Sequence, residues 1–164
     1  FSELKIASLF ADQTGYHDYF ASCNRGFKIT QKTEKKWCCN CDKCRFVFLI
    51  LAPFLTPAAM LKIFGRNLFD DMSQHLGFET LLGLKEHKPF ECVGELEGAQ
   101  VALNLIAGHK KWRKMPMVKS LAVQVADKFG EGPKALKDAL SVRHSSWMTR
   151  RFKKAIDAFE IYKK

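Results

Sequence analysis

The chain has 164 residues, of which 47% are apolar and 14 are phenylalanine, and this composition excludes a disordered tail. A chain of this length fits one compact domain with a real core. The formal net charge is +10, and no signal peptide is visible. Because the chain begins at Phe1 rather than at a methionine, we expect a segment of a longer cytoplasmic protein.

The positive charge is concentrated in the last third of the chain. Residues 1–109 contain 12 Lys/Arg and 12 Asp/Glu, whereas residues 110–164 contain 15 and 5. A basic lobe of this kind favours polyanionic partners such as nucleic acid, a nucleotide-linked substrate or an acidic surface. A solvated helical face that keeps the protein soluble explains the same charge, so both interpretations stay open.

The first element is predicted over residues 2–10, where Ser2 is a suitable N-cap and apolar residues follow at helical spacing. Tyr16, Tyr19 and Phe20 then bring aromatic bulk up to Cys23. Residues 24–37 are polar and basic, which predicts an exposed loop or an irregular hairpin.

Four cysteines form the most informative motif, with the spacing C-x14-C-x2-C-x2-C: Cys23, Cys38, Cys41 and Cys44. Two-residue gaps let neighbouring sulfurs converge on one ion, which is typical of tetrahedral zinc. A closed four-sulfur site is structural, because it leaves no open position for water. Cys39 is an alternative to Cys38 as a ligand. Disulfides are the alternative to a metal, although disulfide scaffolds are usually shorter and richer in cysteine.

Helices are predicted for most of the remaining chain. Residues 46–55 are apolar but too few to span a bilayer, so we expect a buried helix that ends near Pro53 and no membrane insertion. Thr56 and Pro57 have the pattern of a helix start, and Gly65 that of its end. Further helices are predicted over residues 70–83, 95–107, 117–129 and 133–140.

The last predicted helix follows Ser145 and Ser146, which are suitable caps. Its apolar residues recur at helical spacing: Met148, Phe152, Ala155, Ile156 and Phe159. Four cations lie off this stripe: Arg150, Arg151, Lys153 and Lys154. The sequence therefore predicts a mainly α-helical domain built around a zinc knuckle. Within one compact unit, residues 1–55 form the knuckle segment, and residues 56–164 form a helical region with a basic lobe.

Ionisable groups that are able to do chemistry gather in the loop over residues 88–95. Glu91, Cys92 and Glu95 place two carboxylates and a thiol within five residues, and either kind of group transfers protons when its pKa is tuned. Alternatively, Cys92 is an ordinary buried thiol and the two glutamates cap the next helix.

Several basic side chains are candidates for phosphate contacts. Arg143 and His144 precede a predicted helix N-terminus, where backbone N–H groups favour anions, although a plain cap fits equally well. Arg25 and Arg45 lie beside the cysteines, where they either reach a phosphate or offset thiolate charge. Neither a P-loop nor a G-x-G-x-x-G motif occurs in the chain.

These motifs occur together, in order, in residues 22–25, 37–49, 51–54, 63–65 and 88–95. As a set they resemble the bacterial UDP-N-acetylmuramoyl-L-alanyl-L-glutamate epimerase family, over roughly residues 1–110. The cysteine pattern after a Ser-Glu-x-x-Ile-Ala helix is also similar to ATP pyrophosphatases such as 7-cyano-7-deazaguanine synthase, in which it marks a structural zinc.

The resemblance implies an enzyme that inverts the terminal L-glutamate of a UDP-linked muramoyl dipeptide, with ATP and magnesium as further requirements. Adenylylation of a carboxylate would acidify the adjacent Cα–H, and a base would then remove the proton. Glu91, Cys92 and Glu95 are the candidates for proton transfer or substrate contact. The candidates for binding the substrate are Arg25, Arg45, Lys88, Arg143 and His144.

An amino-terminal ATP-binding domain with a Ser-Gly-Gly-x-Asp-Ser loop, expected from the resemblance, is not in this sequence. We therefore expect the carboxy-terminal part of a larger α/β ATP-pyrophosphatase-like enzyme, inactive on its own. Two other interpretations remain open: a zinc-bearing nucleic-acid-binding or RNA-modifying module, and a metal-stabilised interaction domain without catalysis.

Overall fold

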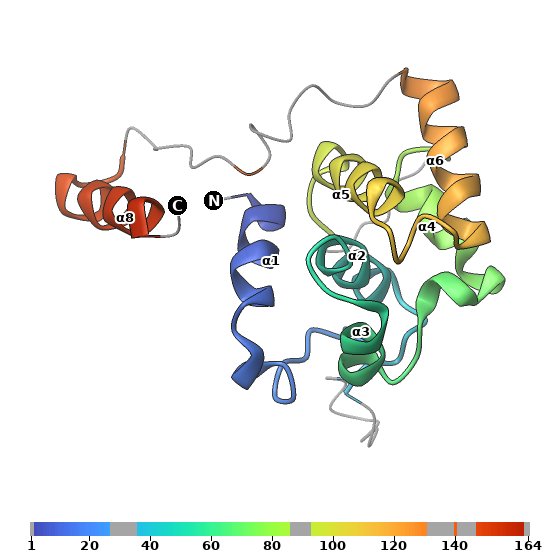
Figure 1. Ribbon diagram of the computed structural model, residues 1–164, viewed down its shortest axis with the longest axis horizontal. Coiled ribbons are helices and arrows are strands. Elements are labelled where there is room, and N and C mark those ends of the chain that lie inside the picture. Colours follow the sequence, from blue (N-terminus) through green and yellow to red (C-terminus); the bar gives the residue numbers. More distant parts are fainter. Residues whose placement is uncertain (1, 27–35, 86–92, 131–139, 141–146, 163–164) are drawn as a thin grey trace.

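The computed structural model describes residues 2–26, 36–85, 93–130, 140 and 147–162, with the backbone alone over 159–162. Within these ranges all regular structure is helical, which confirms the prediction of a mainly α-helical domain. The elements in chain order are α1 (Glu3–Ala11), η1 (Thr14–Tyr16), α2 (Asp42–Leu51), α3 (Pro57–Phe64), η2 (Leu68–Asp70), η3 (Met72–Gln74), α4 (His75–Leu81), α5 (Leu96–Gly108), α6 (Pro116–Phe129) and α8 (Arg150–Tyr162) (Figure 1).

The predicted helix caps are confirmed. The Ser2 side chain accepts a hydrogen bond from the Lys5 backbone N–H at 3.1 Å, at the start of α1. Thr56 Oγ1 accepts one from the Ala59 N–H at 3.2 Å, and Pro57 occupies the first position of α3. Gly65 ends α3 at φ 76°, in the left-handed region that glycine enters without a Cβ penalty. Local sequence therefore determines where these helices begin and end.

The helix α2 lies at the centre of the domain. It packs against α1, α4 and α5, and Figure 1 shows it surrounded by these helices and α3. Its residues from Phe46 to Leu51 are all buried, as predicted for an apolar run, and the helix ends before Pro53. Because hydrophobic side chains cover most of its circumference, α2 is stable only when other helices surround it.

An aromatic cluster fills the core around α2. The Phe48 ring lies 5.1 Å from the rings of Phe64 and Phe69 and 6.1 Å from that of Trp112. Trp112 is fully buried, and its Nε1–H donates a hydrogen bond to the Leu55 carbonyl oxygen at 3.1 Å. One contiguous core thus contains residues from both sides of the predicted division at residues 55 and 56, a division that stays a prediction.

The region before α4 differs from the predicted continuous helix over residues 70–83. Asn67 Oδ1 accepts a hydrogen bond from the Phe69 N–H, and Asp71 Oδ1 accepts one from the Ser73 N–H, both at 3.1 Å. Side chains of this kind compete with the helix for backbone donors. The chain therefore makes the short 3₁₀ turns η2 and η3 first, and the α-helix begins only at His75.

The carboxy-terminal helix α8 is confirmed at Arg150–Tyr162, and Figure 1 shows it set apart from the other helices. The helix predicted over residues 133–139 and the cap at Ser145 and Ser146 lie outside the described residues. Among the described helices, none has the length and apolar character needed to cross a bilayer.

We expect Phe48→Ala to lower the free energy of unfolding by about 3–5 kcal/mol, because it leaves a cavity among three aromatic rings. Phe152→Ala is the matched control: Phe152 is exposed, and its truncation should change stability by no more than about 0.5 kcal/mol. Urea denaturation followed by far-UV circular dichroism measures both. Similar losses for the two variants would contradict this description of the core.

Candidate metal centre and its surroundings

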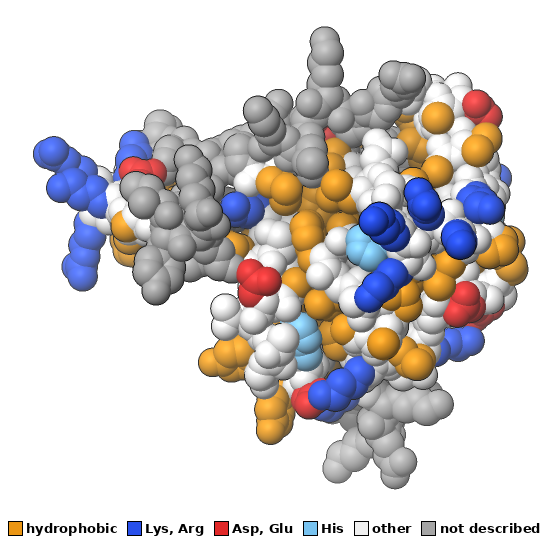
Figure 2. All heavy atoms as spheres, viewed as in Figure 1, with side chains coloured by type: hydrophobic (Ala, Val, Ile, Leu, Met, Phe, Trp, Pro, Cys, Tyr) orange, Lys and Arg blue, Asp and Glu red, His pale blue; other side chains and the backbone are white. Residues whose placement is uncertain are grey.

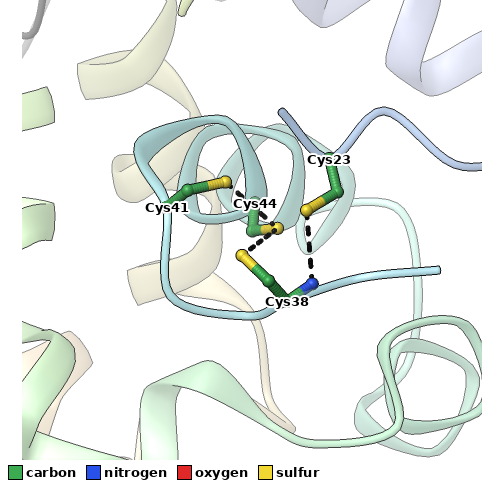
Figure 3. Close-up of side chains that lie close together, drawn as sticks. All are labelled: Cys23, Cys38, Cys41 and Cys44. Atoms are coloured by element: carbon green, nitrogen blue, oxygen red, sulfur yellow. Dashed lines mark hydrogen bonds between the residues drawn. The ribbon is translucent and has the colours of Figure 1, made fainter. Parts of the chain in front are cut away.

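The four predicted cysteine ligands come together at the start of α2. Cys41 occupies the N-cap position of α2 and Cys44 lies in its first turn. Cys38 comes from the segment just before the helix, and Cys23 comes from the segment that follows η1 (Figure 3). The two-residue gaps place three sulfurs on one turn and one helix end, and the longer loop returns the fourth.

The spacing of the sulfurs fits a tetrahedral ion. Cys44 Sγ lies 3.5 Å from Cys41 Sγ and 3.7 Å from Cys38 Sγ, and all four sulfurs lie within 4.8 Å of one another. A zinc ion with Zn–S bonds of about 2.3 Å requires sulfurs that are about 3.8 Å apart. A disulfide requires sulfurs at about 2.05 Å, and these cysteines are unpaired. The geometry therefore suits a metal ion and not the disulfide alternative.

Backbone donors surround the sulfurs. Cys23 Sγ accepts hydrogen bonds from the N–H groups of Gly26 at 3.2 Å and of Cys38 at 3.3 Å. Cys38 Sγ accepts one from the Asn40 N–H at 3.4 Å. Donors of this kind stabilise negative sulfur and orient it toward a shared ion. Cys23 and Cys44 are fully buried, so solvent contributes little to this stabilisation.

The sulfurs perturb one another's ionisation. A hydrogen bond with the Cys44 thiol lowers the pKa of Cys41 to about 4, and the same contact, with burial, raises the pKa of Cys44. Burial also raises the pKa of Cys38. One thiolate is therefore stabilised by neighbouring thiols that keep their protons. A divalent ion at the same point would replace those protons, since the thiolate is the form that binds metal.

Cys39 faces away from the cluster, which resolves the geometric ambiguity between Cys38 and Cys39. Its thiol donates a hydrogen bond to the Phe64 carbonyl oxygen at 3.2 Å, and burial raises its pKa to about 11. Its backbone adopts φ 54°, in the left-handed region that non-glycine residues rarely occupy. That turn points Cys38 and Cys39 in different directions, so Cys38 supplies the fourth sulfur.

Arg45 braces the knuckle against the rest of the domain. Its guanidinium donates to Asp42 Oδ1 at 2.6 Å, to Gln74 Oε1 at 2.9 Å and to Asn40 Oδ1 at 3.2 Å. A Cβ at Gly77 would lie 2.3 Å from Arg45 Nε, so only glycine leaves room for this side chain. The Asp42–Arg45 pair has the i, i+3 spacing that sequence can indicate, but Gln74 and Gly77 carry no such signal. Phosphate binding by Arg45 stays a prediction.

The structure locates only some of the other predicted site residues. Arg25 is exposed near Cys23, and Glu95 is exposed at the N-cap position of α5, where its side chain makes no capping hydrogen bond. Five predicted residues lie outside the described part of the chain: Lys88, Glu91, Cys92, Arg143 and His144. Their roles therefore stay predictions.

The segment next to Glu95 is tightly seated on the domain. Val93 is buried, and Gly94 has φ 61°. A Cβ at Gly94 would lie 1.9 Å from Glu3 Oε2 and 2.3 Å from Phe46 Cζ, so this backbone lies directly against α1 and α2. Close approach of this kind requires glycine. It fixes Glu95 relative to the helix that carries Cys41 and Cys44.

A second polar cluster, which sequence reasoning missed, joins α4 to α6. His75 Nε2 lies 3.2 Å from Ser120 Oγ, and His75 Nδ1 lies 3.6 Å from Glu79 Oε1. Lys85 pairs with the other Glu79 oxygen at 3.3 Å. The order Ser-His-Glu is that of a nucleophilic triad, but Ser120 lies in the middle of α6, where helical hydrogen bonds occupy the backbone donors that an oxyanion would need. The cluster therefore serves as a connection between helices.

The fold and the sulfurs define the class of protein: a helical domain organised around a four-cysteine set of potential metal ligands. A comparison with protein families finds that the MurL C-terminal domain matches residues 19–136, which include all four cysteines. The chain belongs to this family.

Three similar proteins share the name UDP-N-acetyl-alpha-D-muramoyl-L-alanyl-L-glutamate epimerase. Those of Micromonospora sp. and Salinispora tropica are 48% identical over 126 and 120 residues, which cover 77% and 73% of this chain. That of Xanthomonas oryzae pv. oryzae is 44% identical over 119 residues, or 72% of this chain. The matched part is only 26–28% of each relative's length. No solved structure matches the chain.

We expect Cys41→Ser to abolish zinc binding, because it removes one of the four converging sulfurs, whereas Cys39→Ser should retain one ion per chain. Metal analysis of the purified variants measures this difference. Chelation should lower the melting temperature of the wild type and of Cys39→Ser, but leave Cys41→Ser unchanged. Equal metal content and stability in all three proteins would remove the metal from this site.

We expect Gly77→Ala to cost about 1–3 kcal/mol of stability, because the added methyl displaces the middle of the Arg45 side chain. The control is Gly98→Ala in α5, where a Cβ meets no atom within 4 Å and helix propensity predicts a gain of up to about 1 kcal/mol. Chemical denaturation of the zinc-loaded protein compares them. A neutral or stabilising Gly77→Ala would show that the Arg45 brace is dispensable.

Proposed function

We propose that this chain is the carboxy-terminal portion of an ATP-dependent epimerase, which converts the terminal L-glutamate of UDP-N-acetylmuramoyl-L-alanyl-L-glutamate to D-glutamate in peptidoglycan precursor synthesis. The supporting observation is the family match over residues 19–136, together with the shared name of the three relatives. Since the chain spans about a quarter of each relative, the activity belongs to a longer cytoplasmic protein with an amino-terminal ATP-binding domain.

In this proposal the cysteine knuckle holds a structural zinc ion. Cys23, Cys38, Cys41 and Cys44 supply four thiolates, and the ion provides a cross-link between segments that are not otherwise joined. A ligand set of four sulfurs is complete, so the substrate has no place in it. The role of the knuckle is to hold Arg25 and the start of α2 in a fixed relation.

Proton transfer is assigned to the loop that ends at Glu95. Epimerisation removes the proton from Cα of the terminal glutamate and returns one on the opposite face, so it requires groups on both faces. Glu91, Cys92 and Glu95 are the candidates. The seating of Gly94 against Glu3 and Phe46 supports this assignment, because a fixed backbone limits the positions that the Glu95 carboxylate can reach.

Phosphate contacts are assigned to basic side chains: Arg25, Arg45, Lys88, Arg143 and His144. Arg25 is exposed and free to meet a diphosphate, whereas Arg45 holds three protein partners and acts mainly on the knuckle. ATP and Mg²⁺ would bind the amino-terminal domain, where nucleotide activation of a substrate carboxylate would make the Cα proton more acidic. A relation to ATP pyrophosphatases is part of the same proposal.

The test uses the full-length protein and the UDP-linked dipeptide in D₂O. Cys92→Ala should abolish epimerisation while leaving the fold intact, and Glu95→Gln should lower kcat by about 10²–10⁴-fold if it transfers a proton. Glu97→Gln, a change of the same kind at an exposed residue two positions further along, should remain fully active. Deuterium incorporation at Cα and the D-to-L ratio measure the reaction. Full activity of both Cys92→Ala and Glu95→Gln would refute the assignment of the loop.

A further inference from the structure

The helix α8 is distinct from the rest of the chain in position and in family membership. The family match ends at residue 136, and α8 begins at Arg150. Figure 1 shows it standing apart from the helices that surround the core. Its apolar residues therefore do not serve the hydrophobic core, and another environment must explain them.

The helix has two opposite faces of different chemistry. With 3.6 residues per turn, Phe152, Ala155 and Ile156 fall within an arc of about 100°. The cations Arg150, Arg151, Lys153 and Lys154 occupy the remaining circumference. From residue 150 to residue 158 there are four cations and one carboxylate, Asp157. This is a basic amphipathic helix with a narrow apolar face.

Bulky apolar groups on and beside this helix are in solvent. Phe152 is 63% exposed, and Trp147, three residues before the helix, is 92% exposed. Figure 2 shows Lys and Arg side chains projecting from the same end of the molecule, away from the main body. An exposed phenylalanine and tryptophan next to a cluster of cations mark an interaction surface more specifically than charge alone.

We propose that α8 binds the surface of an anionic lipid bilayer, lying in the plane of the interface with Phe152 and Ile156 among the acyl chains. The four cations would remain at the level of the negatively charged headgroups, and Trp147 has the amphipathic ring that favours this boundary. At 13 residues the helix is too short to cross the hydrocarbon region, which requires about 20. It lies on the membrane and does not span it.

The two faces favour a bilayer over other partners. A nucleic acid would neutralise the cations but would leave the aliphatic side chain of Ile156 unburied, since duplex backbones offer only charge. A second copy of the helix would cover the apolar arc but would bring four further cations close to the first four. Only an anionic interface accommodates both arcs at once.

The experiment measures co-sedimentation of the full-length protein with two kinds of vesicle: phosphatidylcholine alone, and an equimolar mixture of phosphatidylcholine and phosphatidylglycerol. We expect binding to the mixed vesicles only. The variant R150E/R151E/K153E/K154E should lower the partition coefficient by roughly a hundredfold or more, because each basic residue near an anionic surface contributes about 1 kcal/mol. Phe152→Glu should lower it by at least about tenfold through the apolar face.

The matched control is K110E/K111E/R113E/K114E, which makes the same change of charge in the exposed turn between α5 and α6. This control should retain most of the vesicle binding, and circular dichroism should show that all variants fold. Three results would each overturn the proposal: no preference for anionic vesicles, an equal loss in the control, or unchanged binding by Phe152→Glu. Binding of α8 to duplex DNA or single-stranded RNA in the absence of vesicle binding would overturn it in favour of a nucleic-acid partner.

Discussion

The convergence of four sulfurs at the amino-terminal end of α2 is the constraint on which the rest of the structure depends. Cys23 and Cys38 lie on segments without regular secondary structure, whereas Cys41 and Cys44 belong to the central helix. Joining them fixes irregular chain to the element that carries Phe48 and the aromatic core. The hydrophobic effect places α2 inside the domain, but it does not determine where the polar segments around the knuckle lie.

The knuckle and the core are connected by directed polar contacts as well as by packing. Arg45 reaches from the first turn of α2 to Gln74, and Gly77 provides the space for it. On the other side, Gly94 lies against Glu3 and Phe46 and so seats the start of α5. The knuckle, the η3–α4 region and the segment at Glu95 are therefore held by contacts to the same central helix.

Sequence reasoning succeeded where a local signal determines the structure. The caps at Ser2 and Thr56, the end of α3 at Gly65 and the convergence of the cysteines all follow from residue type and spacing. Sequence could not choose between Cys38 and Cys39, because that choice depends on the backbone conformation of a single residue. It also missed the Arg45–Gln74 contact, in which the partners are 29 residues apart. The candidate loop was recognised by its residue types, and the structure describes only its last part.

Trp37 immediately precedes Cys38 and lies between Phe20 and Phe64, with ring centroids 5.2 and 4.5 Å away. It is almost completely buried, as is Trp112, which lies in the main core. The indole emission of Trp37 therefore depends on the order of the cysteine segment, since loosening of that segment would admit water to the ring. Ion loading and release at the knuckle thus have an intrinsic optical reporter, which needs no attached dye.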